Sequence, residues 1–153
     1  IIVGRSFGGP VVARMAMDYP SLVGGVVMVA PAVDPNAEKF VWCSIIGKWS
    51  LINWMLPKYM KVATDEKYSH TKELSEMIPL WQNICAPVTI IQGLSDNLVN
   101  PSNATFAEKM IINAPKERIM LEGVPHSVCS HRPDLVRDAI LKHVSLNQLM
   151  LVN

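Results

Sequence analysis

The sequence has few of the residues that cross-link or anchor small domains. Only 3 cysteines, Cys43, Cys85 and Cys129, occur in 153 residues, and they form no Cys-x-x-Cys pair. This spacing argues against a disulfide framework and against a cysteine zinc site, so we expect three reduced, buried thiols. A chain of this length buries roughly 70% of its unfolded surface on folding and does not need such support.

An excess of either charge is also lacking. The 14 Lys and Arg residues and 13 Asp and Glu residues give a net charge of +1, which argues against nucleic acid or an anionic membrane as a partner. The longest apolar stretch, 40–57, is interrupted by Lys48 and Asn53 and falls short of the roughly 18 residues of a membrane span. No histidine pair has ligand spacing with a carboxylate, so we expect neither a metal nor another cofactor.

Half of the residues are hydrophobic, and their pattern alternates between short continuous runs and amphipathic segments. Continuous valine- and isoleucine-rich runs are typical of strands buried on both faces, whereas helical spacing indicates amphipathic helices. We expect strands near 1–3, 25–30, 87–93 and 118–122, helices near 8–19, 101–113 and 133–149, and two or three helices within 34–82. This alternation predicts an α/β fold, a parallel sheet with helices on both faces.

The motif Gly4-x-Ser6-x-Gly8 lies between the first expected strand and the first expected helix. A sharp strand-to-helix turn strains the serine backbone and exposes its hydroxyl, and small residues on either side let neighbouring backbone pass closely. A serine hydroxyl is a poor nucleophile by itself and needs an adjacent base. The motif therefore predicts partners for Ser6 elsewhere in the sequence.

Two candidate partners follow later strands. Asp96 lies a few residues past the strand that ends near Gln92, and His126 lies just past the strand that ends at Glu122. Sites in open α/β sheets form at the carboxyl ends of the strands. We therefore expect Ser6, Asp96 and His126 to lie at one edge of the sheet, in the chain order expected for this type of turn.

Together these segments resemble the α/β-hydrolase family. The stretch VGRSFGGPVVARMAMDYP is similar to the family's nucleophile elbow and following helix, PVTIIQGLSDNLVNP to its strand and acid-bearing loop, and ERIMLEGVPHSVCSHRPDLV to its last strand and histidine loop. The resemblance implies a nucleophile at Ser6, an acid at Asp96, a base at His126 and an oxyanion-hole donor in the backbone amide of Phe7. The extra residue in Val99-Asn100-Pro101, where Val-Pro is usual, is a minor departure.

The resemblance covers the C-terminal half of the α/β-hydrolase fold. The family's early strands and its second oxyanion donor precede the elbow, so we expect the fragment alone to be inactive or nearly so. The implied organisation has a core segment at 1–33 with the elbow, a helical lid or cap insert at 34–82, and a C-terminal core at 83–153 with the acid and histidine loops. The sequence leaves the compartment and the oligomeric state open.

Each candidate also has a simpler interpretation. Ser6 could be a helix N-cap, and Asp96 a turn residue, with Asp34 as a fallback acid. His131 could rival the predicted base, although it is more simply the beginning of the last helix. His70 and His143 are expected on the surface or on a helix face.

The first half of the insert has three of the chain's four tryptophans, and large apolar residues recur there at helical spacing: Trp42, Ile45, Trp49, Ile52 and Leu56. Such a face could pack on the sheet, line a pocket for an apolar group or, less simply, contact a membrane surface. We assign a substrate pocket to Arg5, Trp42, Trp49 and Val99.

The function expected from these residues is a serine hydrolase that cleaves a carboxylic ester or related small acyl substrate, through an acyl-serine intermediate. The apolar insert favours an acyl group such as that of a monoacylglycerol or lysophospholipid. The alternatives are a non-catalytic hydrolase-like protein that binds a ligand, and a C–C hydrolase or acyltransferase of the same fold.

Overall fold

The computed structural model describes residues 1–37 and 70–152 of the chain. It contains four strands, β1 (Ile2–Arg5), β2 (Val26–Val29), β3 (Val88–Gly93) and β4 (Lys116–Leu121), which form one parallel sheet in the order β1-β2-β3-β4. The register places Ile2 beside Val26, and Val26 beside Val88. The expected parallel sheet is therefore confirmed, with each strand within a few residues of its predicted position.

Helices connect and cover these strands. The described helices are α1 (Gly8–Asp18), α5 (Ser102–Met110), α6 (Val128–His131) and α7 (Pro133–Val152); residues 70–77 are also helical and lead into the 3-10 helix η1 (Ile78–Asn83). Helix α7 begins with proline and has Asp134 in its first turn, both favourable at a helix N-terminus. The short helix α6 was not expected from the sequence. Most of the predicted insert at 34–82 lies outside the described residues, and the division into 1–33, 34–82 and 83–153 stays a prediction.

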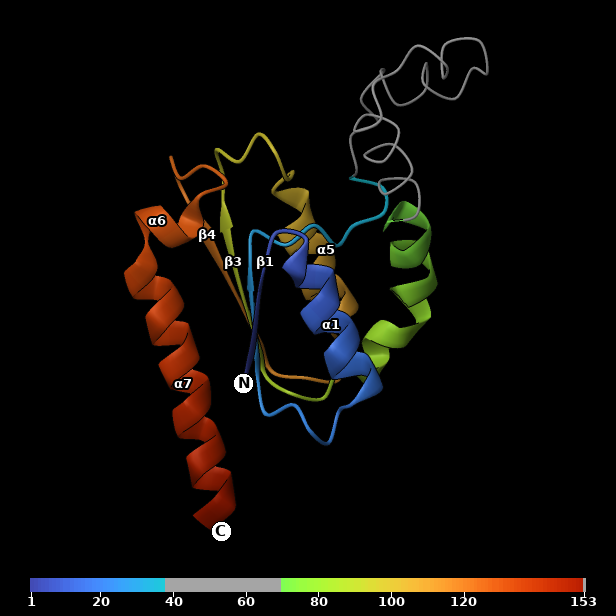
Figure 1. Ribbon diagram of the computed structural model, residues 1–153, viewed down its shortest axis with the longest axis vertical. Coiled ribbons are helices and arrows are strands. Elements are labelled where there is room, and N and C mark those ends of the chain that lie inside the picture. Colours follow the sequence, from blue (N-terminus) through green and yellow to red (C-terminus); the bar gives the residue numbers. More distant parts are fainter. Residues whose placement is uncertain (38–69, 153) are drawn as a thin grey trace, which may run out of the picture.

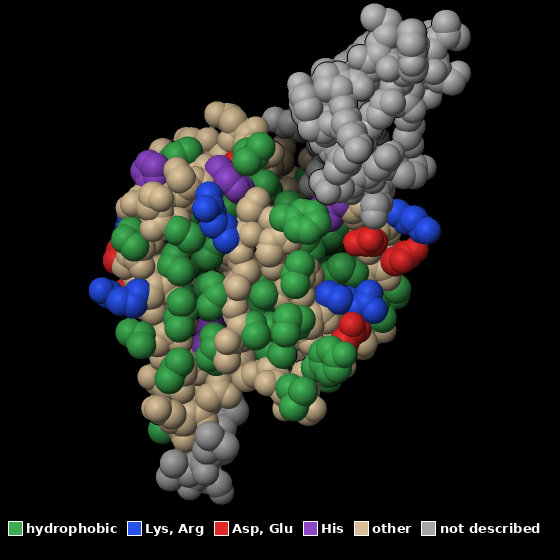
Figure 2. Space-filling model, in the orientation of Figure 1, with side chains coloured by type: hydrophobic (Ala, Val, Ile, Leu, Met, Phe, Trp, Pro, Cys, Tyr) green, Lys and Arg blue, Asp and Glu red, His purple; other side chains and the backbone are tan. Residues whose placement is uncertain are grey.

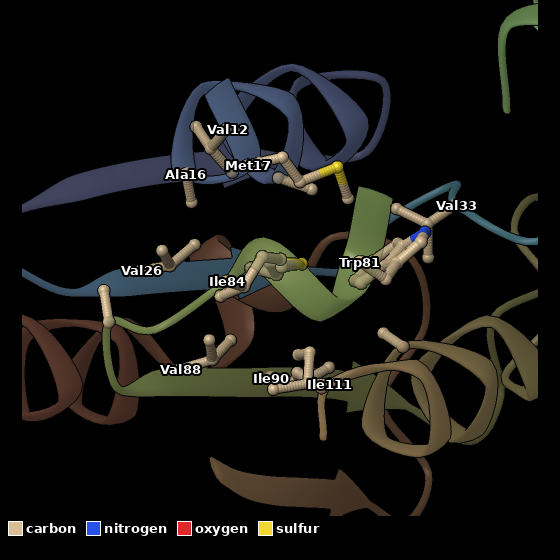
Figure 3. Packing of buried hydrophobic residues seen from close by; sticks show 14 of the residues in the cluster. Val12, Ala16, Met17, Val26, Val33, Trp81, Ile84, Val88, Ile90 and Ile111 are labelled. Carbon is tan, nitrogen blue, oxygen red and sulfur yellow. The ribbon is translucent and has the colours of Figure 1, made fainter. Parts of the chain in front are cut away.

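The sheet lies between two helical layers (Figure 1), with α1, η1 and α5 on one face and α6 and α7 on the other. Strand β2 is at the centre, and all four of its residues are buried, as its continuous apolar run predicted. On the first face Trp81 of η1 packs edge-on against Phe106 of α5, with ring centroids 5.9 Å apart. Figure 3 shows how Trp81 and Ile84 fill the space between α1 and the sheet.

Strand β1 forms one edge of the described sheet. This edge is only partly covered: Val3 of the strand exposes 44% of its surface, and Ile1, just before the strand, exposes 41%. Hydrophobic side chains gather over the middle of the face on which β1 and α1 lie (Figure 2). All four strands run in one direction, so their carboxyl ends, and the loops that carry Ser6, Asp96 and His126, lie at the same edge of the sheet.

Candidate active site

Ser6 follows β1 directly and adopts a backbone conformation that side-chain-bearing residues rarely adopt, with φ at 51°. Hydrogen bonds hold it there: its amide donates to the Val29 carbonyl at 2.9 Å, and its carbonyl accepts from the amides of Gly9 and Ala32. A strained residue fixed on three sides is typical of functional turns. The turn therefore has the strain that the motif predicted.

The two glycines of the motif differ in their surroundings. A Cβ on Gly4 would clash with the carbonyl of Gly8 and lie 2.6 Å from Cγ2 of Val12, so only glycine fits where α1 passes over the end of β1. A Cβ on Gly8 would meet no described atom within 4 Å. The steric reason expected for both glycines thus applies to Gly4, and the described residues give no such reason for Gly8.

Phe7, rather than Ser6, is the N-cap of α1, and no side chain caps this helix. The N-cap interpretation of Ser6 is therefore wrong. The first amides of a helix lack acceptors within the helix, and the positive end of its dipole lies among them. The backbone amide of Phe7 lies at this end of α1, next to Ser6, and its role as an oxyanion donor stays a prediction.

Asp96 lies in the loop after β3, and its carboxylate accepts four hydrogen bonds. Oδ1 accepts from the backbone amides of Leu98 and Val99, at 2.9 and 2.8 Å. Oδ2 accepts from Nε2 of Gln92 at 3.0 Å and lies 2.7 Å from Nδ1 of His126. Burial by itself raises the pKa of Asp96, but these four donors outweigh it and hold the pKa below its ordinary value.

His126 reaches Asp96 because its loop folds back over the end of β3. The amide of Ser95 donates to the Val124 carbonyl at 3.1 Å, and a Cβ on Gly93 would clash with that same carbonyl. The imidazole of His126 is half-buried, and its Nδ1 faces the carboxylate of Asp96. In the tautomer that donates from Nδ1 to this carboxylate, Nε2 has a free lone pair, as a general base requires.

The structure thus brings Asp96 and His126 together, and places Ser6 at the same edge of the sheet. Among residues 1–37 and 70–152, no hydrogen bond joins Ser6 to His126. The role of Ser6 as the partner of this imidazole accordingly stays a prediction.

Several other predicted residues can now be placed. Arg5 is exposed at the end of β1, and Val99 is buried and binds Asp96 through its amide. Asp34 accepts a hydrogen bond from the amide of Asn36, which makes it a turn residue. Trp42 and Trp49, like Cys43 and the rest of the apolar face of the insert, lie outside the described residues.

The other histidines correct the sequence analysis. His131 ends α6 instead of beginning the last helix. His70 and His143, expected on the surface or on a helix face, both lie in helices and expose only 8% and 2% of their surface, so the helix-face alternative is the one that holds. His143 is buried because it packs directly on Gly25, where a side chain would clash with it. Nε2 of His143 lies 3.0 Å from the Thr89 hydroxyl.

The two described cysteines are both free thiols. Cys85 is exposed and Cys129 is half-buried, so the expectation of buried thiols is wrong for Cys85.

Sequence analysis missed one residue of the site, Gln92. The sequence pattern predicts Gln92 only as the end of a buried strand, yet its side chain contacts the carboxylate of Asp96. The available indication was an amide in the otherwise apolar run Val-Thr-Ile-Ile-Gln-Gly, since buried polar groups need partners.

A groove of about 330 Å³ lies next to Phe7, between α1 and the helical residues 70–77. Phe7 is 61% exposed, and its ring contacts the His70 ring at a tilt of 34°, with centroids 4.6 Å apart. The groove lining is mainly apolar and includes neither Ser6 nor His126: Phe7, Pro10, Val11, Arg14, Met15, His70, Glu73, Leu74, Glu76 and Met77.

No group of three or more potential metal ligands occurs among the described residues. Within the same part of the chain, no helix has the length and apolar character needed to cross a bilayer.

Comparison with solved structures defines the fold: the chain has the α/β-hydrolase fold. It is similar to the monoacylglycerol lipase of Paleococcus ferrophilus, with 17% identity, 94% of this chain and 67% of that chain covered, and a TM-score of 0.65. It is also similar to the peroxisomal α/β-hydrolase Lpx1 of Saccharomyces cerevisiae, with 15% identity, 99% and 53% covered, and a TM-score of 0.63. No protein-family model and no curated protein sequence matches the chain.

The chain spans only part of the structures it matches, between 50% and 67% of their length in the comparisons with a predicted hydrolase of Thermoplasma acidophilum and with the Paleococcus lipase. At these identities the likeness establishes the fold, and one fold supports many chemistries. Function must therefore be argued from the site.

Proposed function

We propose that the protein containing this chain is a serine hydrolase that cleaves carboxylic esters or related acyl substrates. The observation that carries the proposal is the 2.7 Å contact between Nδ1 of His126 and Oδ2 of Asp96, at the sheet edge where Ser6 occupies a strained turn. Acyl transfer requires an imidazole oriented by a buried carboxylate and a serine on a strand-to-helix turn within its reach, and this sheet edge carries all three residue types.

In this mechanism Nε2 of His126 accepts the proton of the Ser6 hydroxyl while the serine oxygen attacks the carbonyl carbon. Asp96 stabilises the resulting imidazolium through the Nδ1 hydrogen. The oxyanion accepts a hydrogen bond from the Phe7 amide. His126 then protonates the leaving alcohol, and water that it activates hydrolyses the acyl-serine.

The groove beside Phe7 supports an apolar group on the substrate, because most of its lining is hydrocarbon. We therefore favour an ester with an acyl chain, of the class represented by monoacylglycerols and lysophospholipids. Among the matched structures, the Paleococcus protein is a monoacylglycerol lipase.

The test is covalent labelling by a fluorophosphonate probe, followed by peptide mass spectrometry. We expect labelling at Ser6, lost in Ser6→Ala and in His126→Ala. A folded protein that takes up no label, yet binds an acyl compound equally well with and without Ser6→Ala, would instead be a ligand-binding protein. Labelling at Ser6 without ester hydrolysis would point to acyl transfer to an alcohol or to C–C cleavage, which product analysis separates.

A further inference from the structure

Gln92 is a polar residue near the carboxyl end of β3, with no exposed surface. Its Nε2 donates to Oδ2 of Asp96 at 3.0 Å and to the Gly93 carbonyl at 3.2 Å. Both neighbours are acceptors, so the NH₂ end of the amide must face them. The other end, Oε1, is buried and has no hydrogen-bond partner among residues 1–37 and 70–152.

Packing alone does not explain a glutamine here. A buried acceptor without a partner is unfavourable, and an apolar side chain of similar shape would fill the same space without that cost. What an apolar side chain would lack is the donor to Asp96. This contact is the feature that the glutamine adds to the site.

The amide of Gln92 donates to Oδ2, one of the two carboxylate oxygens of Asp96. Oδ1 of Asp96 is already held by the amides of Leu98 and Val99, which fix the carboxylate from one side. Oδ2 is shared between Gln92 and the imidazole of His126. Any change in the hydrogen bond from Gln92 therefore acts on the oxygen that binds the predicted base.

We propose that Gln92 is a positioning residue for His126, acting through the shared Oδ2 oxygen of Asp96. By donating to Oδ2, its amide withdraws part of the negative charge that would otherwise stabilise the protonated imidazole. Removing this donor would therefore strengthen the interaction of Oδ2 with the imidazole at Nδ1. Among the described residues, Asp96 is the one charged side chain in recorded contact with the His126 ring.

The inference rests on the proposed function for its meaning in catalysis, but it can be tested without turnover. The experiment is an NMR titration of the His126 imidazole in the protein with Gln92→Met, which keeps the shape of the side chain and removes the donor. We expect the titration midpoint to rise by roughly half a pH unit. In ester hydrolysis, activity on the acid side of the profile should then fall about threefold, with little change at higher pH.

Thr89→Val is the matched control, because Thr89 lies in the same strand, is equally buried and bonds only to His143 among the described residues. It is expected to alter stability while leaving the His126 midpoint unchanged. If Gln92→Met does not fold, Gln92→Leu removes the same donor with a smaller side chain.

An unchanged or lowered midpoint in a folded Gln92 variant would overturn the inference, and so would an equal shift in Thr89→Val. Either result would leave labelling of Ser6, and with it the proposed function, unaffected. Absence of Ser6 labelling together with a raised midpoint would remove the proposed function and leave the role of Gln92 toward His126 intact.

Discussion

At the scale of single residues, the site depends on how a buried carboxylate is kept charged. Asp96 has no exposed side-chain surface, and two backbone amides and two side chains donate to it. An uncompensated charge in this position would be costly, so the loop geometry at Leu98 and Val99 is part of the site. Asp34, the fallback acid, has a different contact: its carboxylate accepts from the amide of Asn36 and closes a turn.

Asp96→Asn tests this distinction. An asparagine keeps one acceptor oxygen, and its NH₂ group would face Nδ1 of His126 or a backbone amide, so the imidazole would be held in the wrong tautomer. We expect kcat for a chromogenic ester to fall roughly 10³- to 10⁴-fold. Asp34→Asn is the control and should keep nearly full activity; equal losses in the two variants would contradict the assignment of the acid.

The residues of the site were predictable to different degrees. Ser6, Asp96 and His126 each follow an apolar run, so their common edge follows from strand direction alone. Gln92 was not predictable as part of the site, because its partner is set by how the Asp96 loop folds back. The burial of His143 depends on Gly25, more than one hundred residues earlier, and no local pattern beside Lys142 indicates it.

At the scale of elements, the continuous apolar runs predicted β2 and β3 because strands buried on both faces need no alternation. The four-residue helix α6 is too short to show a helical period, so it was missed, and with it the position of His131. Helix α7 is bound to the sheet by specific contacts as well as by apolar packing: His143 to Thr89, and Asn147 to the Gly24 carbonyl at 2.7 Å.

The His143 contact predicts a pH dependence of stability. Burial lowers the pKa of His143, with a smaller effect in the same direction from Lys142 and an opposing one from Glu117. The unfolded chain therefore binds the proton more readily than the folded chain, and stability is lost as pH falls below about 6.5. We expect the free energy of unfolding, measured by urea denaturation, to decrease between about pH 7 and pH 5.

His143→Gln should reduce this acid-side loss, because glutamine does not titrate. His131→Gln is the control: His131 is exposed and bonds locally to Ser127, so its replacement should leave the slope unchanged. The lowered pKa of Asp96 causes a separate loss of stability at lower pH, as pH falls below the ordinary aspartate pKa of about 3.9. A slope unaffected by His143→Gln would contradict the role given to its burial.

At the scale of the whole molecule, the described sheet has an open edge at β1. Apolar side chains gather on this face of the molecule (Figure 2). Val3 of β1 and Val11 and Met15 of α1 are each at least 43% exposed. An uncovered strand edge flanked by apolar surface tends to pair with other chains. This surface is a property of the tertiary arrangement, and the sequence pattern alone did not reveal it.

We therefore expect the chain by itself to self-associate through β1, and Val3→Lys to reduce this association, because a lysine on an edge strand disfavours pairing with another strand. The measurement is size-exclusion chromatography with light scattering over a range of protein concentrations. Leu22→Lys is the control, since Leu22 is 80% exposed but lies outside the strands. If both substitutions reduced self-association equally, general surface hydrophobicity would be its cause, and the β1 edge would not.

The central claim is that Ser6, His126 and Asp96 act as one unit on an acyl substrate. Its most direct test is to quench the reaction of a p-nitrophenyl ester with acid and locate the acyl group by peptide mass spectrometry. The account predicts an acyl group on Ser6, absent in His126→Ala. Ester turnover with the acyl group on another residue, or an acyl-serine that forms equally well without His126, would contradict it.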